Sequence, residues 1–300
     1  MNKNFVFLGT PKFAADILLG LINNDWLPKL VITEPPKPVG RNKTLTASAV
    51  SQLASQHKLK VAHPQTKQKL TQLLLKGGFD FGIVVAYGRL IPPQAVKVTT
   101  HGLINIHGSL LPKYRGASPV QAAILNGETE TGVSYMVIEP GLDTGPVFAM
   151  HKIQIKPDDT TPSLLNGLAE LVNKTLVQDV DDFLTGKLQA EAQNDNLTTS
   201  TSLIKKTDGE INLSQITPKE LDCKLRAYTP WPGIYTEQFG TRLIIRAGRL
   251  INESFFISEL QWAGKSPVNG AVFAQANPEI LTQLPKTIKI DAINWYLDKD

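Results

Sequence analysis

Short apolar runs alternate with amphipathic stretches over the first third of the chain. The stretches repeat apolar residues at helical spacing, as in Phe13, Ile17, Leu18 and Leu21, whereas the runs have the length of buried strands. This pattern predicts strands at Asn4–Leu8, Leu30–Thr33, Lys60–Ala62 and Phe81–Ala86. It predicts helices at Phe13–Ile22, Ala47–His57 and Thr66–Lys76. Because strands that alternate with helices form parallel sheets, the fold class is expected to be α/β with a mainly parallel sheet.

The pattern changes after a predicted long helix, Thr161–Thr185. The segment Leu188–Ser202 is rich in Gln, Asn, Ser and Thr, which is typical of a linker. Beyond it, short apolar runs broken by Gly and Pro predict a small β-barrel. These runs are Gly233–Phe239, Arg242–Ala247, Ser254–Trp262 and Gly270–Ala274. The domains are therefore expected at residues 1–187 and 206–300, with a linker over 188–205.

Composition narrows the class of protein. With 42% hydrophobic and 19% charged residues, the 300-residue chain matches an ordinary globular protein. No signal-peptide pattern starts the chain, and no apolar run approaches the roughly 20 residues that cross a bilayer. Cys223 is the only cysteine, and no His/Cys spacing resembles a zinc site. We therefore expect a cytoplasmic protein with no membrane span and no metal.

The phosphate-binding signatures of nucleotide enzymes are missing from the sequence. The first predicted turn contains a single glycine, Gly9, and no G-x-G-x-x-G or G-x-x-x-x-G-K-S/T segment occurs. Dinucleotide binding and nucleotide hydrolysis are therefore disfavoured.

Basic residues are concentrated in the first third of the chain. Residues 1–100 carry thirteen Lys and Arg against four Asp and Glu, a net charge of +9. Residues 101–200 carry six against twelve, and the last hundred carry twelve against eleven. Clustered Lys and Arg neutralise phosphates, so the asymmetry suggests an anionic partner. A solvated basic face explains the same pattern, and charge alone slightly favours it.

Candidate chemistry is concentrated after the predicted strand Leu103–His107. Because side chains two positions apart share one face of a strand, Asn105 and His107 are expected to emerge together. A segment rich in Gly and Pro follows the strand, and ligands bind beyond the carboxyl ends of strands in open α/β sheets. A carboxylate, Asp143, lies in a second glycine-flanked turn, Gly141–Gly145.

These three side chains suit acyl transfer to nitrogen. Asn105 and His107 can donate hydrogen bonds to an oxyanion on an attacked carbonyl. Asp143 can orient the imidazole or accept a proton from the attacking amine. Neither Cys223 nor Ser109 has the sequence context of a nucleophile, so direct transfer is the simpler hypothesis. Residue types alone favour a structural alternative, in which Asn105 caps a loop and His107 is a core histidine.

A longer sequence match favours the catalytic interpretation over the structural one. The segments Asn105–Gly116 (NIHGSLLPKYRG) and Gly141–Gly145 (GLDTG) resemble the signature of folate-dependent formyltransferases. This superfamily includes glycinamide ribonucleotide transformylases, amino-sugar formyltransferases and methionyl-tRNA formyltransferases. The resemblance covers about residues 4–275. It implies a Rossmann-like catalytic domain, a small OB-like β-barrel as second domain, and Asn105, His107 and Asp143 as catalytic residues.

The resemblance also implies the formyl donor, 10-formyltetrahydrofolate, with no metal. The resemblance places the pterin ring in a pocket lined by Val85–Ile91 and Ser109–Pro112. The implied folate-binding residues are Val85, Tyr87, Gly88, Ile91, Ser109, Leu110, Leu111 and Pro112.

Outer features resemble the methionyl-tRNA branch of the family. They are Gly9–Ala14 (GTPKFA), the basic loop Pro38–Thr46 and the segment Arg226–Gly233 (RAYTPWPG). In that branch the basic loop inserts at the acceptor arm of the tRNA, and Arg41 and Lys43 stand at the matching positions. The implied function is formylation of methionyl initiator tRNA for translation initiation, by a monomer. Amino-sugar enzymes share the R-A-x-x-P-W-P-G pattern, so a sugar-nucleotide N-formyltransferase that uses the same donor stays open.

Two other classes of protein explain part of the sequence. The triplet Asp143-Thr144-Gly145 matches aspartic proteases, but their chemistry needs two carboxylates, and no second D-T-G or D-S-G occurs. A non-catalytic RNA-binding protein would explain the basic first third, but it would not need Asn105, His107 and Asp143.

Overall fold

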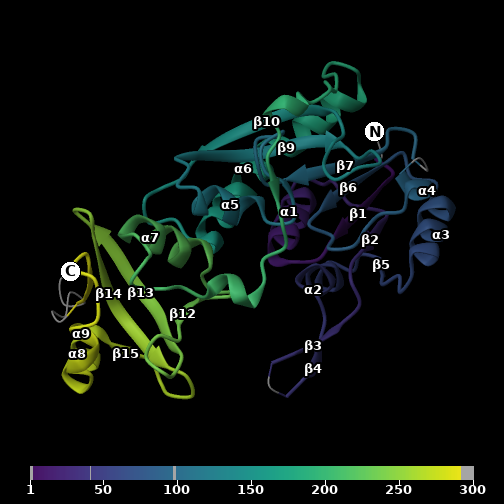
Figure 1. Ribbon diagram of the computed structural model, residues 1–300. Coiled ribbons are helices and arrows are strands. Elements are labelled where there is room, and N and C mark those ends of the chain that lie inside the picture. The colour runs from purple at the N-terminus through teal and green to yellow at the C-terminus, as the bar shows by residue number, and fades with distance from the viewer. Residues whose placement is uncertain (1–2, 41, 97–98, 292–300) are drawn as a thin grey trace. The chain divides into compact units, whose positions relative to one another are not determined.

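Two compact units make up the chain (Figure 1). The computed structural model describes residues 3–40, 42–96 and 99–291. The first unit consists of Met1–Pro119, Glu130–Gln154 and Leu165–Thr201. The second unit consists of Val120–Thr129, Ile155–Leu164 and Ser202–Asp300.

The first unit is built on a seven-stranded sheet with the order β10-β9-β7-β6-β1-β2-β5. Its strands are β1 (Phe5–Gly9), β2 (Leu30–Ile32), β5 (Val61–Ala62), β6 (Phe81–Val85), β7 (Leu103–His107), β9 (Glu130–Val137) and β10 (Val147–Gln154). The five strands from β5 to β7 run parallel. Strand β9 is antiparallel to β7, and β10 is antiparallel to β9. The expected α/β class with a mainly parallel sheet is confirmed.

Helices pack against this sheet. They are α1 (Lys12–Asn23), α2 (Ala49–Gln56), α3 (Lys67–Gly77), α4 (Pro93–Val96) and α6 (Thr161–Leu184). The packing of strand β1 explains why its sequence is continuously apolar. Val6 and Leu8 pack with Leu74 of α3, whereas Phe5 stacks on Phe81 with 5.1 Å between the ring centroids. A strand whose two faces are both buried requires apolar residues at every position.

The sheet register aligns the loops that follow neighbouring parallel strands. Val84 of β6 pairs with Asn105 of β7, so both strands end at the same edge. The hydroxyl of Thr10, after β1, donates to the carbonyl oxygen of Tyr87, after β6, at 2.8 Å. This edge is where open α/β sheets bind ligands.

Two smaller pairings complete the first unit. Strands β3 (Lys37–Val39) and β4 (Thr44–Thr46) form a hairpin. Strand β8 (Arg115–Gly116) pairs in parallel with β11 (Ser200–Thr201), which follows a short 3-10 helix, η1 (Asp195–Leu197). Both η1 and β11 lie within residues 188–205, the segment whose composition predicts a linker.

The second unit contains a five-stranded sheet. Strands β12 (Ile234–Thr236), β13 (Leu243–Ile251), β14 (Ser254–Trp262) and β15 (Val268–Asn269) are antiparallel neighbours, and β16 (Ile288–Ile290) pairs in parallel with β14. The other elements of this region are α5 (Pro119–Leu125), η2 (Lys206–Gly209), α7 (Pro218–Ala227), α8 (Gly270–Ala276) and α9 (Pro278–Leu281). Across the described residues of both units, no helix combines the length and apolar character needed to span a membrane.

The expectation of a strand at Gly270–Ala274 is wrong, because this run forms α8. The side chain of Asn269 accepts a hydrogen bond from the amide of Val272 at 2.9 Å and caps the helix. Phe273 is buried, whereas Val272 is 50% exposed. A five-residue apolar run is too short to distinguish a strand from a buried helix by periodicity.

Candidate active site

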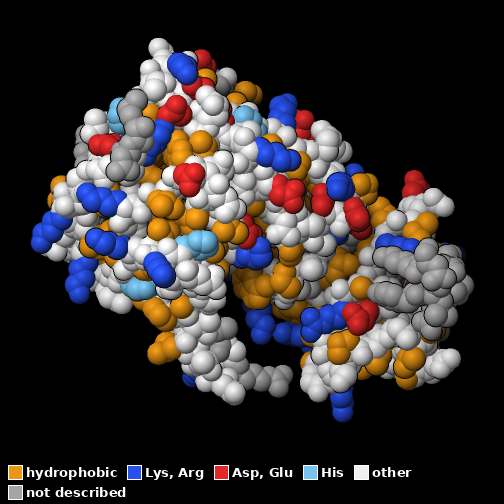
Figure 2. Space-filling view, turned by 180° about the vertical axis from the view of Figure 1, so that it is seen from behind, with side chains coloured by type: hydrophobic (Ala, Val, Ile, Leu, Met, Phe, Trp, Pro, Cys, Tyr) orange, Lys and Arg blue, Asp and Glu red, His pale blue; other side chains and the backbone are white. Residues whose placement is uncertain are grey.

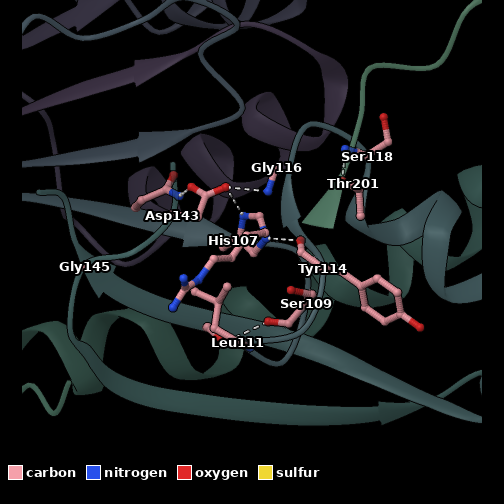
Figure 3. Close-up of polar contacts among 12 residues, drawn as sticks. His107, Ser109, Leu111, Tyr114, Gly116, Ser118, Asp143, Gly145 and Thr201 are labelled. Atoms are coloured by element: carbon pink, nitrogen blue, oxygen red, sulfur yellow. Dashed lines mark hydrogen bonds and ion pairs between the residues drawn. The ribbon is translucent and has the colours of Figure 1, made fainter. Parts of the chain in front are cut away.

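Strand β7 carries two of the three predicted catalytic residues, and the turn between β9 and β10 carries the third. The amide nitrogen Nδ2 of Asn105 donates to Oδ1 of Asp143 at 3.4 Å. Nδ1 of His107 lies 3.6 Å from Oδ2 of Asp143 (Figure 3). Because alternate residues of a strand share a face, β7 presents the amide and the imidazole side by side. The structure therefore brings the three residues together.

The loop after β7 fixes the ring of His107. Nε2 of the ring lies 2.9 Å from the carbonyl oxygen of Tyr114. A carbonyl oxygen only accepts hydrogen bonds, so Nε2 carries a proton and Nδ1 is the nitrogen that faces Asp143. The imidazole is buried, with 6% exposure. Its orientation is therefore set by one carbonyl and one carboxylate.

The carboxylate of Asp143 is held by main chain as well as by side chains. Its Oδ2 accepts a hydrogen bond from the amide of Gly116 at 2.8 Å. Asp143 has φ 53° and Tyr114 has φ 60°. Residues other than glycine seldom adopt this left-handed region, and such strain gathers at functional sites. Both residues that contact the ring of His107 therefore have strained backbones.

Gly116 occupies a position where no other residue fits. Its φ of 115° disfavours L-residues, and a Cβ there would overlap the carbonyl oxygen of Thr201. Because this residue is a glycine, the loop can approach β11 closely while the amide of Gly116 donates to Asp143.

The Ser109–Pro112 loop is anchored by a buried serine of β9. The hydroxyl of Ser134 donates to the carbonyl oxygen of Ser109 at 2.8 Å and accepts from the amide of Leu111 at 3.0 Å. The hydroxyl of Ser109 donates to the carbonyl oxygen of Lys113 at 2.6 Å. Hydrogen bonds between two serine hydroxyls and main-chain groups of the loop therefore hold the loop in this shape.

The residues expected to bind folate are Val85, at the end of β6, and residues of the two segments that follow β6 and β7. Val85 and Tyr87 are buried, whereas Gly88, with φ 82°, is exposed and Ile91 is partly exposed. Burial raises the pKa of the Tyr87 phenol, so this side chain is neutral at physiological pH. In the second segment, Ser109 and Leu111 are buried, and surface remains at Leu110 and Pro112.

The two residues expected to bind tRNA belong to a different region. Arg41 lies outside the described residues. Lys43 is exposed in the turn of the β3–β4 hairpin, where its amide donates to the carbonyl oxygen of Gly40 at 3.2 Å. Figure 1 shows this hairpin projecting away from the seven-stranded sheet. The structure therefore does not place Lys43 with the three predicted catalytic residues.

Sequence reasoning missed the residues that support the site. Gln193 contacts both Arg115 and the Asp143 turn, yet it lies in a polar segment whose composition indicates a linker. The Tyr114 carbonyl and the Gly116 amide are main-chain groups. Because every residue has the same main-chain groups, a sequence does not indicate which of them support a site. Only the glycine at position 116 indicates an unusual backbone conformation.

The polar cluster suits hydrogen bonding and proton transfer. An amide nitrogen, an imidazole and a carboxylate can together stabilise an oxyanion and accept a proton. Among the residues that the structure describes, no group of three or more His, Cys, Asp or Glu side chains is placed to hold a metal ion.

Known proteins share both the sequence and the fold. Residues 3–180 match the model of the formyl transferase family. A curated methionyl-tRNA formyltransferase from Myxococcus xanthus is 41% identical over 246 residues, which are 81% of this chain and 78% of that protein.

Two solved structures resemble the fold. A methionyl-tRNA formyltransferase from Clostridium thermocellum has a TM-score of 0.61 at 14% identity, over 87% of this chain and 98% of that one. An N-formyltransferase from Helicobacter canadensis, in complex with folinic acid and dTDP-3-aminofucose, has a TM-score of 0.63 at 21% identity, over 84% and 89% of the two chains. The chain belongs to the formyl transferase family and, within it, to the methionyl-tRNA formyltransferases.

Proposed function

We propose that this formyltransferase moves the formyl group of 10-formyltetrahydrofolate to the α-amine of methionyl initiator tRNA, for translation initiation. The observation that carries the proposal is the contact of Asn105, His107 and Asp143 at the ligand-binding edge of the sheet. The name of the Myxococcus xanthus relative supports the choice of acceptor. The proposal places the chain in the cytoplasm, as a monomer.

The proposed mechanism is direct attack of the neutral amine on the formyl carbon. An oxyanion forms on the formyl oxygen as the carbon becomes tetrahedral. The Asn105 amide has two N–H groups, so one can face Asp143 while the other donates to the oxyanion. The Nε2 proton of His107 is used by the Tyr114 carbonyl. Nδ1 is therefore the ring nitrogen that faces the reacting centre and Asp143.

Asp143 serves as the proton acceptor in this mechanism. The attacking nitrogen loses a proton to Asp143, and the folate nitrogen takes up a proton as its bond to the formyl carbon breaks, so that tetrahydrofolate leaves as a neutral amine. Oδ2 of Asp143 already accepts from Gly116, and Oδ1 accepts from Asn105 across a long 3.4 Å. Oδ1 is therefore the freer acceptor, directly or through a water.

The donor is proposed to bind between the loops after β6 and β7. Gly88 and the partly exposed Leu110 and Pro112 offer backbone and apolar surface there. Folinic acid, a formylated folate, occupies the structure of the Helicobacter canadensis N-formyltransferase. The same class of ligand is proposed here, with the formyl group directed toward Asn105.

The acceptor is proposed to contact the basic surface of the first unit. Figure 2 shows Lys and Arg side chains gathered at the left of the view, the side of α3 when Figure 1 is turned. The exposed lysines of this helix are Lys67, Lys69 and Lys76. Arg41 and the exposed Lys43 are proposed to contact tRNA phosphates directly.

The five-stranded sheet of the second unit is proposed to be an OB-like barrel that supports the tRNA. The pairing of β13 with β14 is irregular between Ile245 and Gly248. Such bulges bend a strand and help a sheet to close. The short parallel strand β16 adds to β14 on the other side. We propose residues 206–300 as this domain and residues 1–187 as the catalytic domain, to which residues 191–201 of the first unit are added.

Replacement of Asp143 by Asn tests the catalytic assignment. Asn has nearly the same shape and tolerates a left-handed backbone, so the turn should keep its conformation. The amide cannot take a proton, so we expect turnover to fall by at least about 100-fold, while folate binding stays near wild type. Single-turnover formylation and titration with a folate analogue measure the two quantities. Near-normal turnover of the Asp143→Asn enzyme would remove Asp143 from the mechanism.

A further inference from the structure

A segment after α6, residues 191–201, lies along both loops of the active site, and we call it the strap. The amide and the carbonyl of Glu191 each bond to the main chain of Val147 at 2.9 Å. Strand β11 in the strap pairs with β8. The hydroxyl of Thr199 accepts from the amide of Tyr114 at 2.8 Å, and the Tyr114 carbonyl holds the catalytic imidazole. The strap is therefore part of the scaffold of the reacting centre.

One side chain of the strap, Gln193, joins the two loops. Its Oε1 accepts from Nε and Nη2 of Arg115 at 3.0 and 2.8 Å. Its Nε2 donates to the carbonyl oxygens of Asp143 and Gly145 at 2.9 and 2.7 Å. Two donated and two accepted bonds are the full complement of a carboxamide. The Arg115 side chain is buried, where hydrogen bonds are stronger than in water.

These four bonds set the separation between the loop after β7 and the turn that carries Asp143. Gly116, the neighbour of Arg115, donates its amide to the carboxylate of Asp143. Gln193 thus links the main chain of Asp143 to the loop after β7, and the amide of Gly116 links the side chain of Asp143 to the same loop. The turn needs this support because Asp143 has φ 53°.

We propose that Gln193 is a positioning residue for formyl transfer. It contacts no reacting atom, and it holds Asp143 against His107 and Asn105 by fixing the distance between the two loops. The inference rests on the proposed function, because it requires Asp143 to take part in the reaction. A misplacement of about 1 Å can lower a rate by about 100-fold.

Two substitutions separate positioning from packing. Gln193→Met keeps the length of the side chain and removes all four bonds. Gln193→Glu keeps an oxygen acceptor for Arg115 but faces the carbonyls of Asp143 and Gly145 with a second acceptor. We expect each to lower kcat by about 10- to 100-fold and to leave KM for donor and tRNA within about 3-fold.

The matched control is Gln178→Met on α6, whose exposed amide donates to Asp182 at 2.8 Å. It should keep wild-type kcat. The thermal midpoint of every variant reports its folding. If Gln193→Met fails to fold, Gln193→Glu carries the test, since it retains an oxygen acceptor for the buried Arg115, which also pairs with Asp195 at 2.8 Å. Wild-type kcat in Gln193→Glu would mean that the residue only packs against Arg115 and would overturn the inference.

A double variant distinguishes this inference from the proposed function. Because Gln193 acts through Asp143, adding Gln193→Glu to Asp143→Asn should cause little further loss in single-turnover rate. Full additivity of the two losses would overturn the positioning role. If Asp143→Asn alone keeps its turnover, the proposed function of Asp143 fails. If Asp143→Asn is inactive and both Gln193 variants keep wild-type kcat, only the positioning role fails.

Discussion

The three proposed catalytic residues differ in how firmly their surroundings hold them. His107 is buried and bonded to Tyr114 at 2.9 Å, and Asp143 accepts from Gly116 at 2.8 Å. Asn105 is partly exposed and reaches Asp143 across 3.4 Å, at the long limit of a hydrogen bond. Its amide therefore contributes little to folding and remains available to the substrate.

Substitution of Asn105 should accordingly separate activity from stability. We expect Asn105→Ala to lower kcat by about 100- to 1,000-fold, the usual loss for one oxyanion donor. Its thermal midpoint should stay close to wild type. Steady-state kinetics and thermal unfolding measure the two effects.

The matched control for this prediction is Asn173→Ala on α6. The Asn173 amide donates to the main chain of Asp16 at 3.2 Å, so this variant should lose stability and keep kcat. An Asn105→Ala enzyme that loses stability but retains kcat would assign Asn105 to the fold instead of the reaction.

At the scale of elements, β9 anchors the loop that follows β7. Ser134 is fully buried and bonds to the main chain of Ser109 and of Leu111. Ser134→Ala leaves both groups without this partner, so we expect the free energy of unfolding to fall by about 1–3 kcal/mol. Urea denaturation with an unchanged m-value measures the loss.

Ser55→Ala on α2 is the control for this stability measurement. The Ser55 hydroxyl bonds to its own helix at the carbonyl of Ser51, and the side chain is exposed. Its loss should stay below about 0.5 kcal/mol. Equal losses in the two variants would contradict the anchoring role of Ser134.

The elements also show which features a sequence can predict. Strands β1 and β14 follow from local apolar patterns, and Ser254–Trp262 has the predicted bounds. Strands β8 and β11 span two residues each, and they pair because segments far apart in the chain meet. A two-residue strand carries no periodicity. For the same reason, local patterns placed Asn105 and His107 on one face of a strand but gave no indication of Gln193.

At the scale of the whole molecule, most of the net positive charge and the proposed catalytic residues lie in different parts of the chain. The first hundred residues carry the net charge of +9, whereas His107 and Asp143 come later in the chain. Binding of the tRNA backbone and catalysis should therefore respond separately to substitution. Phosphate contacts weaken as salt rises, because bound counterions are released on association.

Substitution of Lys43 tests this separation. We expect Lys43→Gln to raise KM for tRNA, to leave kcat and the donor KM unchanged, and to reduce the salt dependence of tRNA affinity by about one unit of log–log slope. Lys174→Gln removes the same charge from an exposed position of α6, outside the proposed tRNA surface, and serves as control. Equal effects of the two substitutions would mean that the hairpin contributes only general charge.

The acceptor assay tests the central claim most directly. The purified chain is given 10-formyltetrahydrofolate with either methionyl initiator tRNA or a dTDP-amino sugar, and the formylated product is identified by mass. We predict formylmethionyl-tRNA, formed at a rate that Asp143→Asn lowers by at least about 100-fold, and no formylated sugar. Formylation of the sugar nucleotide with no product on the tRNA would contradict the account.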